Sequence, residues 1–225
     1  NEEKGTDFKI AEERIQGSLA MHTIVQNDSN DFDIDVGIVF EADNLADRGA
    51  ESIRNMFRNA LERKTNTFTD EPEVKTSCVR LKYSEGYHVD FAIFKRHKEY
   101  EWDDEFTYEH AGNKWSIRDI KALEEWFSQK IKEKGIELRQ LVRLSKMFCK
   151  SRDTWGTLPS GMIQTVICEE VFDYNYDRID EKFYFTMKNI VNRLSYTLEV
   201  RAPIDNNRLL TTRQIDLELM ERWKN

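Results

Sequence analysis

The segment at residues 33–40, which reads Asp-Ile-Asp-Val-Gly-Ile-Val-Phe, constrains the fold more than any other part of the chain. Acidic and apolar residues alternate at its start and its second half is apolar, a pattern typical of a β-strand. Successive side chains of a strand leave opposite faces, so Asp33 and Asp35 share one face, with Cα atoms roughly 6.5–7 Å apart. The other face can pack on a helix through Ile34, Val36, Ile38 and Phe40.

A third acidic residue, Asp90, stands among apolar neighbours in the segment His-Val-Asp-Phe-Ala-Ile at residues 88–93. It alternates with apolar residues on both sides, so this segment also predicts a strand. If the two strands are neighbours, Asp90 joins Asp33 and Asp35 on one face of the sheet. His88 is expected on the same face, where a hydrogen-bonded structural histidine is the simpler interpretation.

Three carboxylates on one face repel one another unless a cation compensates their charge. A pair of Mg²⁺ ions about 3.5–4 Å apart suits such a set, because carboxylate oxygens are ligands that Mg²⁺ accepts. The alternative is a solvated strand edge, where aspartates discourage edge-to-edge pairing. Asp31 with Asp33 would form a second pair of the same spacing. We favour the pair at 33 and 35, because apolar residues flank it and the apolar run follows directly.

Gly17 and Ser18 have the character of a phosphate-binding turn. A glycine lets the backbone approach a phosphate closely, and a serine hydroxyl with neighbouring amides can donate hydrogen bonds to its oxygens. The alternative is an ordinary C-cap glycine at the end of a helix. Such a helix is predicted by a capping Asp7 and apolar residues at helical spacing, Phe8, Ala11 and Ile15.

The remaining sequence divides into a mixed half and a helical half. Before Gly112 we expect a helix at 53–61, strands at 79–83 and 89–93 joined by a turn at 84–86, and a further strand within 100–110. After Gly112, helical periodicity recurs at residues 123–131, 138–148, 163–171, 187–194 and 215–220. The prediction is an α+β fold with a first domain at residues 1–112 and a helical lobe at 113–225.

Composition excludes several classes of protein. The chain has 13 Phe, eight Tyr and five Trp but only nine Gly and three Pro, which predicts an ordered globule. A net charge of −8 argues against wholesale binding to nucleic acid or an anionic membrane surface. Three widely spaced cysteines, Cys78, Cys149 and Cys168, favour buried thiols over disulfides or zinc. With no apolar run of roughly 18 residues and no signal peptide, we expect a cytoplasmic protein without a membrane partner.

The motifs resemble those of the DNA polymerase β-like nucleotidyltransferase superfamily: Gly-Ser at 17–18, the segment 33–40, and Val-Asp-Phe at 89–91. Thr23 and the helical second half resemble the oligoadenylate synthase and cyclic GMP-AMP synthase branch. Residues 137–146 resemble the branch's helix with a triphosphate-binding lysine, and Leu-Pro-Ser-Gly at 158–161 resembles the helix start that follows. The chain is most similar to the bacterial CD-NTases of anti-phage signalling, over roughly residues 8–220. The implied fold is a polymerase β-like nucleotidyltransferase core with a mixed sheet, followed by a helical lobe.

The resemblance implies metal-binding roles for the three acidic residues. Asp33 and Asp35 would hold two Mg²⁺ ions, which Mn²⁺ can replace. Asp90 would bind the catalytic ion and help to activate the attacking hydroxyl group. These three residues would therefore be both the catalytic and the metal-ligating set.

The resemblance also implies nucleotide-binding residues. Gly17 and Ser18 would bind the β- and γ-phosphates of the donor nucleoside triphosphate, Lys146 would contact the triphosphate, and Ser160 would assist. A ribose hydroxyl would attack the α-phosphate and release pyrophosphate, and repetition would close a cyclic di- or trinucleotide. This second messenger would act on a separate downstream effector.

Two other functions stay open: linear transfer of nucleotides to RNA or protein, and a catalytically silent nucleotide-binding module. Linear transfer would need a basic acceptor groove, which the charge balance does not favour. A silent module has no physical reason to keep three mutually repelling acids. The negative charge and the lack of a zinc-binding Cys/His pattern argue against activation by double-stranded DNA. Relatives are commonly longer than 225 residues, so we expect the final helical part to be missing.

Overall fold

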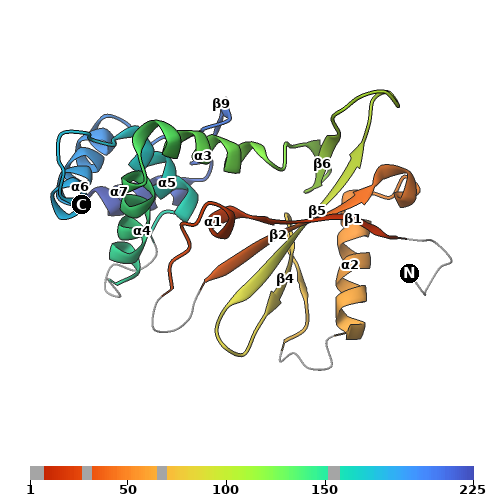
Figure 1. Ribbon diagram of the computed structural model, residues 1–225. Helices are drawn as coiled ribbons and strands as arrows, with labels where there is room; N and C mark the ends of the chain where they lie inside the picture. The colour runs from red at the N-terminus through yellow and green to blue at the C-terminus, as the bar shows by residue number, and fades with distance from the viewer. Residues whose placement is uncertain (1–7, 27–31, 65–69, 152–157) are drawn as a thin grey trace. The chain divides into compact units, whose positions relative to one another are not determined.

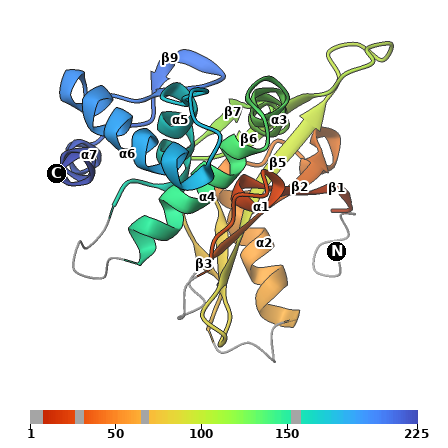
Figure 2. The same cartoon turned by 60° about the vertical axis from the view of Figure 1, so that its left-hand side comes forward.

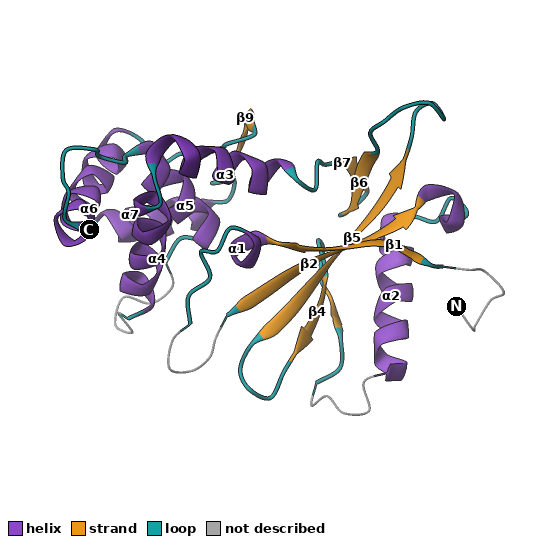
Figure 3. Cartoon of the chain, in the orientation of Figure 1, coloured by secondary structure: helices purple, strands orange, loops and turns teal. Residues whose placement is uncertain are grey.

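The computed structural model describes residues 8–26, 32–64, 70–151 and 158–225, which fall into two compact units. The first unit spans residues 1–20 and 28–121, and the second spans residues 21–27 and 122–225. Most strands lie in the first unit and most helices in the second (Figure 3). The division between the units follows Lys121, because residues 115–117, beyond Gly112, form a strand that still pairs within the sheet.

A mixed sheet is the framework of the first unit (Figure 1). The described residues form β1 (Ile10–Gln16), β2 (Asp33–Glu41), β3 (Glu73–Val74), β4 (Val79–Lys82), β5 (His88–His97), β6 (Thr107–Ala111) and β7 (Trp115–Ile117). The strand order is β1-β2-β5-β4-β3, while β6 pairs with β5 and with β7. Only β2 and β5 run parallel among these pairs of described strands. Their parallel pairing needs a long crossover connection, which includes helix α2 (Ala50–Lys64).

Helix α2 packs its apolar face against one face of the sheet. Ile53 is fully buried in a cluster with Ile38, Phe40 and Ile93, and Val36 lies at its margin. The predicted helix at 53–61 and the predicted apolar face of β2 are thus both confirmed. A 3₁₀ turn, η1 (Ala42–Leu45), leads from β2 towards this helix.

The N-terminal segment is a strand, so the helix predicted from Phe8, Ala11 and Ile15 is wrong. Strand β1 pairs antiparallel with β2, placing Gln16 opposite Asp35. The helical spacing of three apolar residues is a weak local signal, and the hydrogen bonds offered by the edge of β2 override it. Gly17 therefore does not end a helix, but links β1 to the short helix α1 (Gly17–Ala20).

The hairpin predicted between residues 79 and 93 is confirmed. Strands β4 and β5 pair antiparallel, and the Tyr83 amide donates to the Tyr87 carbonyl across the turn. Gly86 has a φ of 101°, a left-handed conformation that glycine adopts without strain. The strand expected within 100–110 is shorter than that stretch and begins at Thr107.

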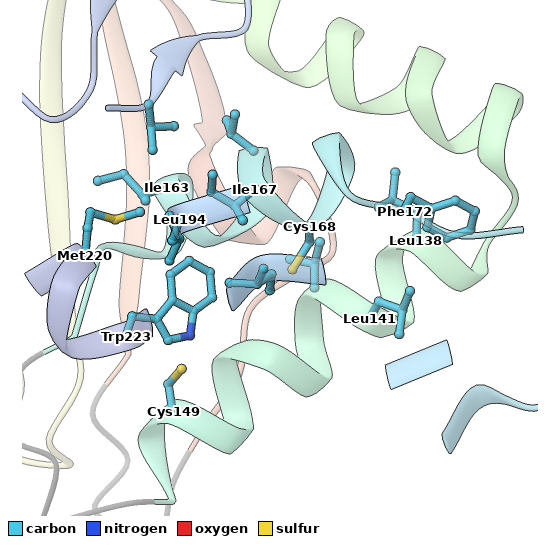
Figure 4. Close-up of a cluster of buried hydrophobic side chains, with 14 of the residues drawn as sticks. Leu138, Leu141, Cys149, Ile163, Ile167, Cys168, Phe172, Leu194, Met220 and Trp223 are labelled. Carbon is cyan, nitrogen blue, oxygen red and sulfur yellow. The ribbon is translucent and has the colours of Figure 1, made fainter. Parts of the chain in front are cut away.

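The second unit contains α3 (Ala122–Lys134), α4 (Glu137–Lys150), α5 (Gly161–Glu170), α6 (Ile179–Tyr196) and α7 (Gln214–Lys224). These match the five predicted helices, and Figure 2 shows α4, α5 and α6 packed together. Their core includes Leu141, Ile167 and Met220, with Cys149 lying near Trp223 (Figure 4). The three cysteines are free and buried, as expected. A small hairpin of β8 (Arg201–Ala202) and β9 (Asp205–Leu209) was missed, because its polar sequence has no strand alternation.

None of the helices in the described part of the chain combines the length and apolar character that crossing a bilayer requires.

The core beneath β2 gives a direct test of this packing. We expect Ile53→Ala to lower the free energy of unfolding by about 3 kcal/mol, because it leaves a cavity between α2 and the sheet. The exposed Asn55→Ala, on the same helix, should change it by less than about 0.5 kcal/mol. Urea unfolding followed by circular dichroism measures both. Equal effects of the two substitutions would contradict the packing of α2.

Candidate functional site

The register of β2 and β5 brings the three predicted carboxylates together. Asp35 lies directly opposite Asp90 across the parallel pair, and Asp33 lies opposite His88. Because partners in register leave the same face, Asp33, Asp35 and Asp90 share the face that α2 does not cover. Figure 1 shows the two strands side by side along the length that carries these residues. Asp31 lies outside the described residues.

Arg80, which the sequence analysis did not single out, lies on the other side of Asp90. It is opposite Asp90 in the β4–β5 pairing. Its Nε donates to Asp90 Oδ1 at 2.7 Å, and its Nη2 donates to Asp90 Oδ2 at 2.6 Å. The signal was available, because Arg80 alternates with Val79 and Leu81 and so had to leave the face that they do not occupy.

The pKa of Asp35 is raised to about 6. Burial is the main cause, and the neighbouring charges of Asp33 and Asp90 raise it further. The interactions of Asp35 with His88 and Arg80 lower its pKa, without cancelling these effects. The site therefore holds more negative charge than its protein surroundings compensate, and a bound cation would relieve this imbalance.

Asp33 is the most exposed of the three carboxylates, with 55% of its side chain accessible, against 14% for Asp90. His88 Nε2 lies 2.8 Å from Asp33 Oδ1, which is a close contact between two polar atoms. The geometry of this contact is not that of a hydrogen bond, and the buried His88 Nε2 has no hydrogen-bond partner. His88 therefore contacts one of the three carboxylates directly, unlike a histidine with a purely structural role.

Gly17 lies directly against Asp35. A Cβ atom built on Gly17 would overlap Asp35 Oδ2, and the residue has a φ of 61°. Both the space and the backbone conformation therefore require glycine at this position. Ser18 follows it within α1, so the predicted Gly-Ser turn and the carboxylates belong to one site in the first unit.

Lys146 and Ser160 belong to the second unit, where they lie near each other. Lys146 is 6% exposed, and its Nζ donates to Thr23 Oγ1 at 3.0 Å and to the Thr23 carbonyl at 3.3 Å. Ser160 is the exposed N-cap of α5, and its hydroxyl accepts from the Ile163 amide. The next residue, Gly161, leaves room for Lys146, because a Cβ there would lie 3.0 Å from the lysine Cε.

A buried polar network supports this start of α5. Gln164 Nε2 donates to the Pro159 carbonyl at 2.8 Å, and Ser145 Oγ donates to Gln164 Oε1 at 3.4 Å. Ser145 precedes Lys146 on α4, so the network ties the lysine-bearing helix to the residue before Ser160. The sequence analysis missed this network, because a serine and a glutamine on helices carry no distinctive spacing.

The donor set of the first unit fits a divalent metal ion. Its three carboxylates provide the oxygen ligands that Mg²⁺ and Mn²⁺ take, and Asp33 and Asp90 add to the effect of burial in raising the pKa of Asp35. The described residues nevertheless contain no cluster of three acidic, histidine or cysteine side chains that is already arranged as a metal cage. Asp33 and Asp90 are directed to His88 and Arg80 instead.

Comparison with known proteins finds similarity to a nucleotidyltransferase domain within the first unit. Residues 11–94, which include all three carboxylates, match the family described as cyclic GMP-AMP synthase DncV-like, nucleotidyltransferase domain. Over 214 residues the chain is 29% identical to a cyclic GMP-AMP synthase of Escherichia albertii, a match that covers 89% of this chain. The match covers 46% of the relative, so the chain spans about half the length of that protein.

Solved structures share the fold across almost the whole chain. Vibrio cholerae DncV in its apo form aligns with a TM-score of 0.72 at 18% identity, covering 95% of this chain and 61% of that one. The Bradyrhizobium diazoefficiens CD-NTase CdnG, in complex with GTP, aligns with a TM-score of 0.68 at 15% identity, covering 98% and 78%. The α+β fold predicted from the sequence, a polymerase β-like core with a helical lobe, is confirmed by these matches.

The contact between Gly17 and Asp35 predicts an unusual coupling between two substitutions. Gly17→Ala should lower the free energy of unfolding by at least about 2 kcal/mol, from the left-handed backbone and the overlap together. In an Asp35→Ala background the overlap with the carboxyl group disappears and only the contact with the Cβ of residue 35, at 3.1 Å, remains, so the cost of Gly17→Ala should fall by about half. Gly112→Ala, where a Cβ meets only ordinary contacts, is the matched control. Additive effects in denaturant unfolding would contradict the contact.

The raised pKa of Asp35 predicts a pH-dependent loss of stability. Between pH 4 and 6 the unfolded state loses the Asp35 proton while the folded state keeps it, so the free energy of unfolding should fall as pH rises. Above pH 7, Asp35→Asn should therefore be more stable than the wild type by roughly 2–3 kcal/mol, in the presence of a chelator. Thermal melts of both proteins from pH 4 to 7.5 test this. A difference that does not vary with pH would show that the carboxyl is not perturbed.

Proposed function

We propose that the chain is a bacterial CD-NTase, which joins nucleoside triphosphates into a cyclic di- or trinucleotide in a Mg²⁺-dependent reaction. The observation that carries the proposal is the set of three carboxylates on one sheet face, with Asp35 opposite Asp90 in a matched nucleotidyltransferase domain. In support, one related structure was solved with GTP, and another, of Vibrio cholerae DncV, with a linear intermediate.

The proposed reaction is an in-line displacement at the α-phosphate of a nucleoside triphosphate. A ribose hydroxyl oxygen of a second nucleotide forms a new bond to phosphorus, the bond to the pyrophosphate oxygen breaks, and the hydroxyl loses its proton. Mg²⁺, when bound, supplies positive charge against the charge that develops on the phosphate oxygens. Asp33 and Asp35 would hold the ions, while Asp90 would hold the catalytic one beside the attacking hydroxyl.

The other predicted residues would bind and orient the nucleotide. The turn at Gly17 and Ser18 lies against Asp35, so it would present its amides and hydroxyl to phosphates next to the ligating carboxylates. Lys146 and Ser160 would add contacts to the triphosphate. Positioning of this kind can supply much of the rate enhancement of a phosphoryl-type transfer, in which the protein does little covalent chemistry.

The product would act as a second messenger on a separate effector, in bacterial anti-phage signalling. This role rests on the resemblance of the sequence motifs to the bacterial CD-NTases, and the chain shares its fold with one of them, CdnG. Bacteria that carry the wild-type gene with its neighbouring genes should restrict phage plating, and a substitution that abolishes synthesis should remove this restriction.

Incubation with labelled ATP, GTP, CTP and UTP and either Mg²⁺ or Mn²⁺ tests the proposed reaction. Small products that resist phosphatase support a cyclic oligonucleotide, because cyclisation leaves no terminal phosphate. Extended RNA, or a labelled protein, would point to linear transfer instead. A chain that consumes no nucleotide under any of these conditions would be a silent binding module.

Asp33→Asn with Asp35→Asn should reduce product formation at least about 100-fold, because the ligands for both ions are lost. The same variant should melt at an unchanged or higher temperature, since it removes mutually repelling charges. Asp104→Asn, at an exposed position between β5 and β6, is the matched control and should keep full activity. Substantial activity of the double variant would refute the roles of Asp33 and Asp35.

A further inference from the structure

Arg80 engages both carboxylate oxygens of Asp90. The two hydrogen bonds, at 2.7 and 2.6 Å, form the bidentate arrangement that is among the strongest charge-assisted contacts in proteins. Only 23% of the Arg80 side chain and 14% of the Asp90 side chain are exposed, so water screens the pair weakly. The β4–β5 register holds the two residues opposite each other.

We infer that Arg80 is an internal counter-ion that competes with a divalent cation for Asp90, so that a metal ion reaches this carboxylate at the expense of the Arg80 contact. The inference rests on the proposed function, which makes Asp90 a metal ligand.

The chemistry of the two groups gives the competition its physical basis. A carboxylate offers about four lone-pair sites on its two oxygens, and the guanidinium fork occupies one on each oxygen. The fork also places a full positive charge against the group, so that an approaching cation is repelled.

The arrangement of the neighbouring carboxylates agrees with this competition. Asp33 is in contact with His88 as Asp90 is with Arg80, and the described residues form no ready-made metal cage. The opposite role, in which Arg80 orients Asp90 for the metal, would make metal affinity depend on the guanidinium. The two roles therefore predict changes of opposite sign when Arg80 is removed.

Binding of Mn²⁺ alone to the whole chain, without nucleotide, separates these roles. Electron paramagnetic resonance reports the free Mn²⁺ concentration during a titration. We expect Arg80→Met to bind Mn²⁺ roughly tenfold more tightly than the wild type, the size of effect that a nearby charge commonly exerts on a carboxylate. Arg80→Lys keeps the charge but loses the fork, and should show a smaller gain.

Two controls distinguish competition for Asp90 from a general effect of charge. Lys82→Met removes the same charge two residues along β4, on the same face but opposite His88, and should gain less than Arg80→Met. Adding Asp90→Asn to Arg80→Met should remove the gain, because the released ligand is then absent. An equal gain from Lys82→Met, or a gain that survives Asp90→Asn, would overturn the inference.

Thermal melts give a second readout that does not depend on activity. Arg80→Met should melt below the wild type without metal, since Asp90 is left partly buried and unpaired, and Mn²⁺ should raise its melting temperature more than that of the wild type. Mn²⁺ affinity that is unchanged or weaker in Arg80→Met would overturn the inference while leaving the proposed function intact. If neither protein binds Mn²⁺ and the wild type makes no product, both the inference and the proposed function fail.

Discussion

The parallel pairing of β2 with β5 is the constraint on which the site in the first unit depends. It places Asp35 opposite Asp90 and Asp33 opposite His88, so that one register fixes four titratable side chains at once. A shift of one residue would turn Asp90 to the face covered by α2. The buried Ile38 and Ile93, which pair with each other on that opposite face, oppose such a shift. The hydrophobic core thus determines where the carboxylates meet.

The same pairing places features in the site that lower the stability of the folded state. Burial and two neighbouring carboxylates raise the pKa of Asp35, and Gly17 occupies a left-handed conformation so that its backbone can lie against that side chain. Neither feature improves the packing of the sheet. Both features are understandable if the site binds a cation and a phosphate. Each feature lowers the stability of the folded state but would then contribute to ligand binding.

Strands and helices with regular hydrophobic periodicity were predicted well from the sequence. Features that depend on contacts between residues distant in the sequence were not predicted. The alternation around Asp33, Asp35 and Asp90 correctly placed the three carboxylates on one face, because the period of a strand leaves no other choice. The segment before Gly17 was misassigned, since its strand exists through pairing with β2 and its local spacing is helical. The face of Arg80 could be read from its alternation with Val79 and Leu81, but its contact with Asp90 could not, because that partner lies ten residues away, across a turn.

The negative net charge of the chain does not indicate that basic side chains lie beside the carboxylates. A net charge of −8 would repel a nucleoside triphosphate at long range, yet Arg80 and Lys82 follow one another along the same face of β4, beside His88 and Asp90. In this arrangement the carboxylates for which we propose metal binding adjoin two cationic side chains. Under that proposal, a nucleotide that arrives with its metal ions would bring the positive charge that the aspartates lack. The contact between Arg80 and Asp90 would then neutralise Asp90 until metal ions arrive, which would link metal binding to the release of a guanidinium group.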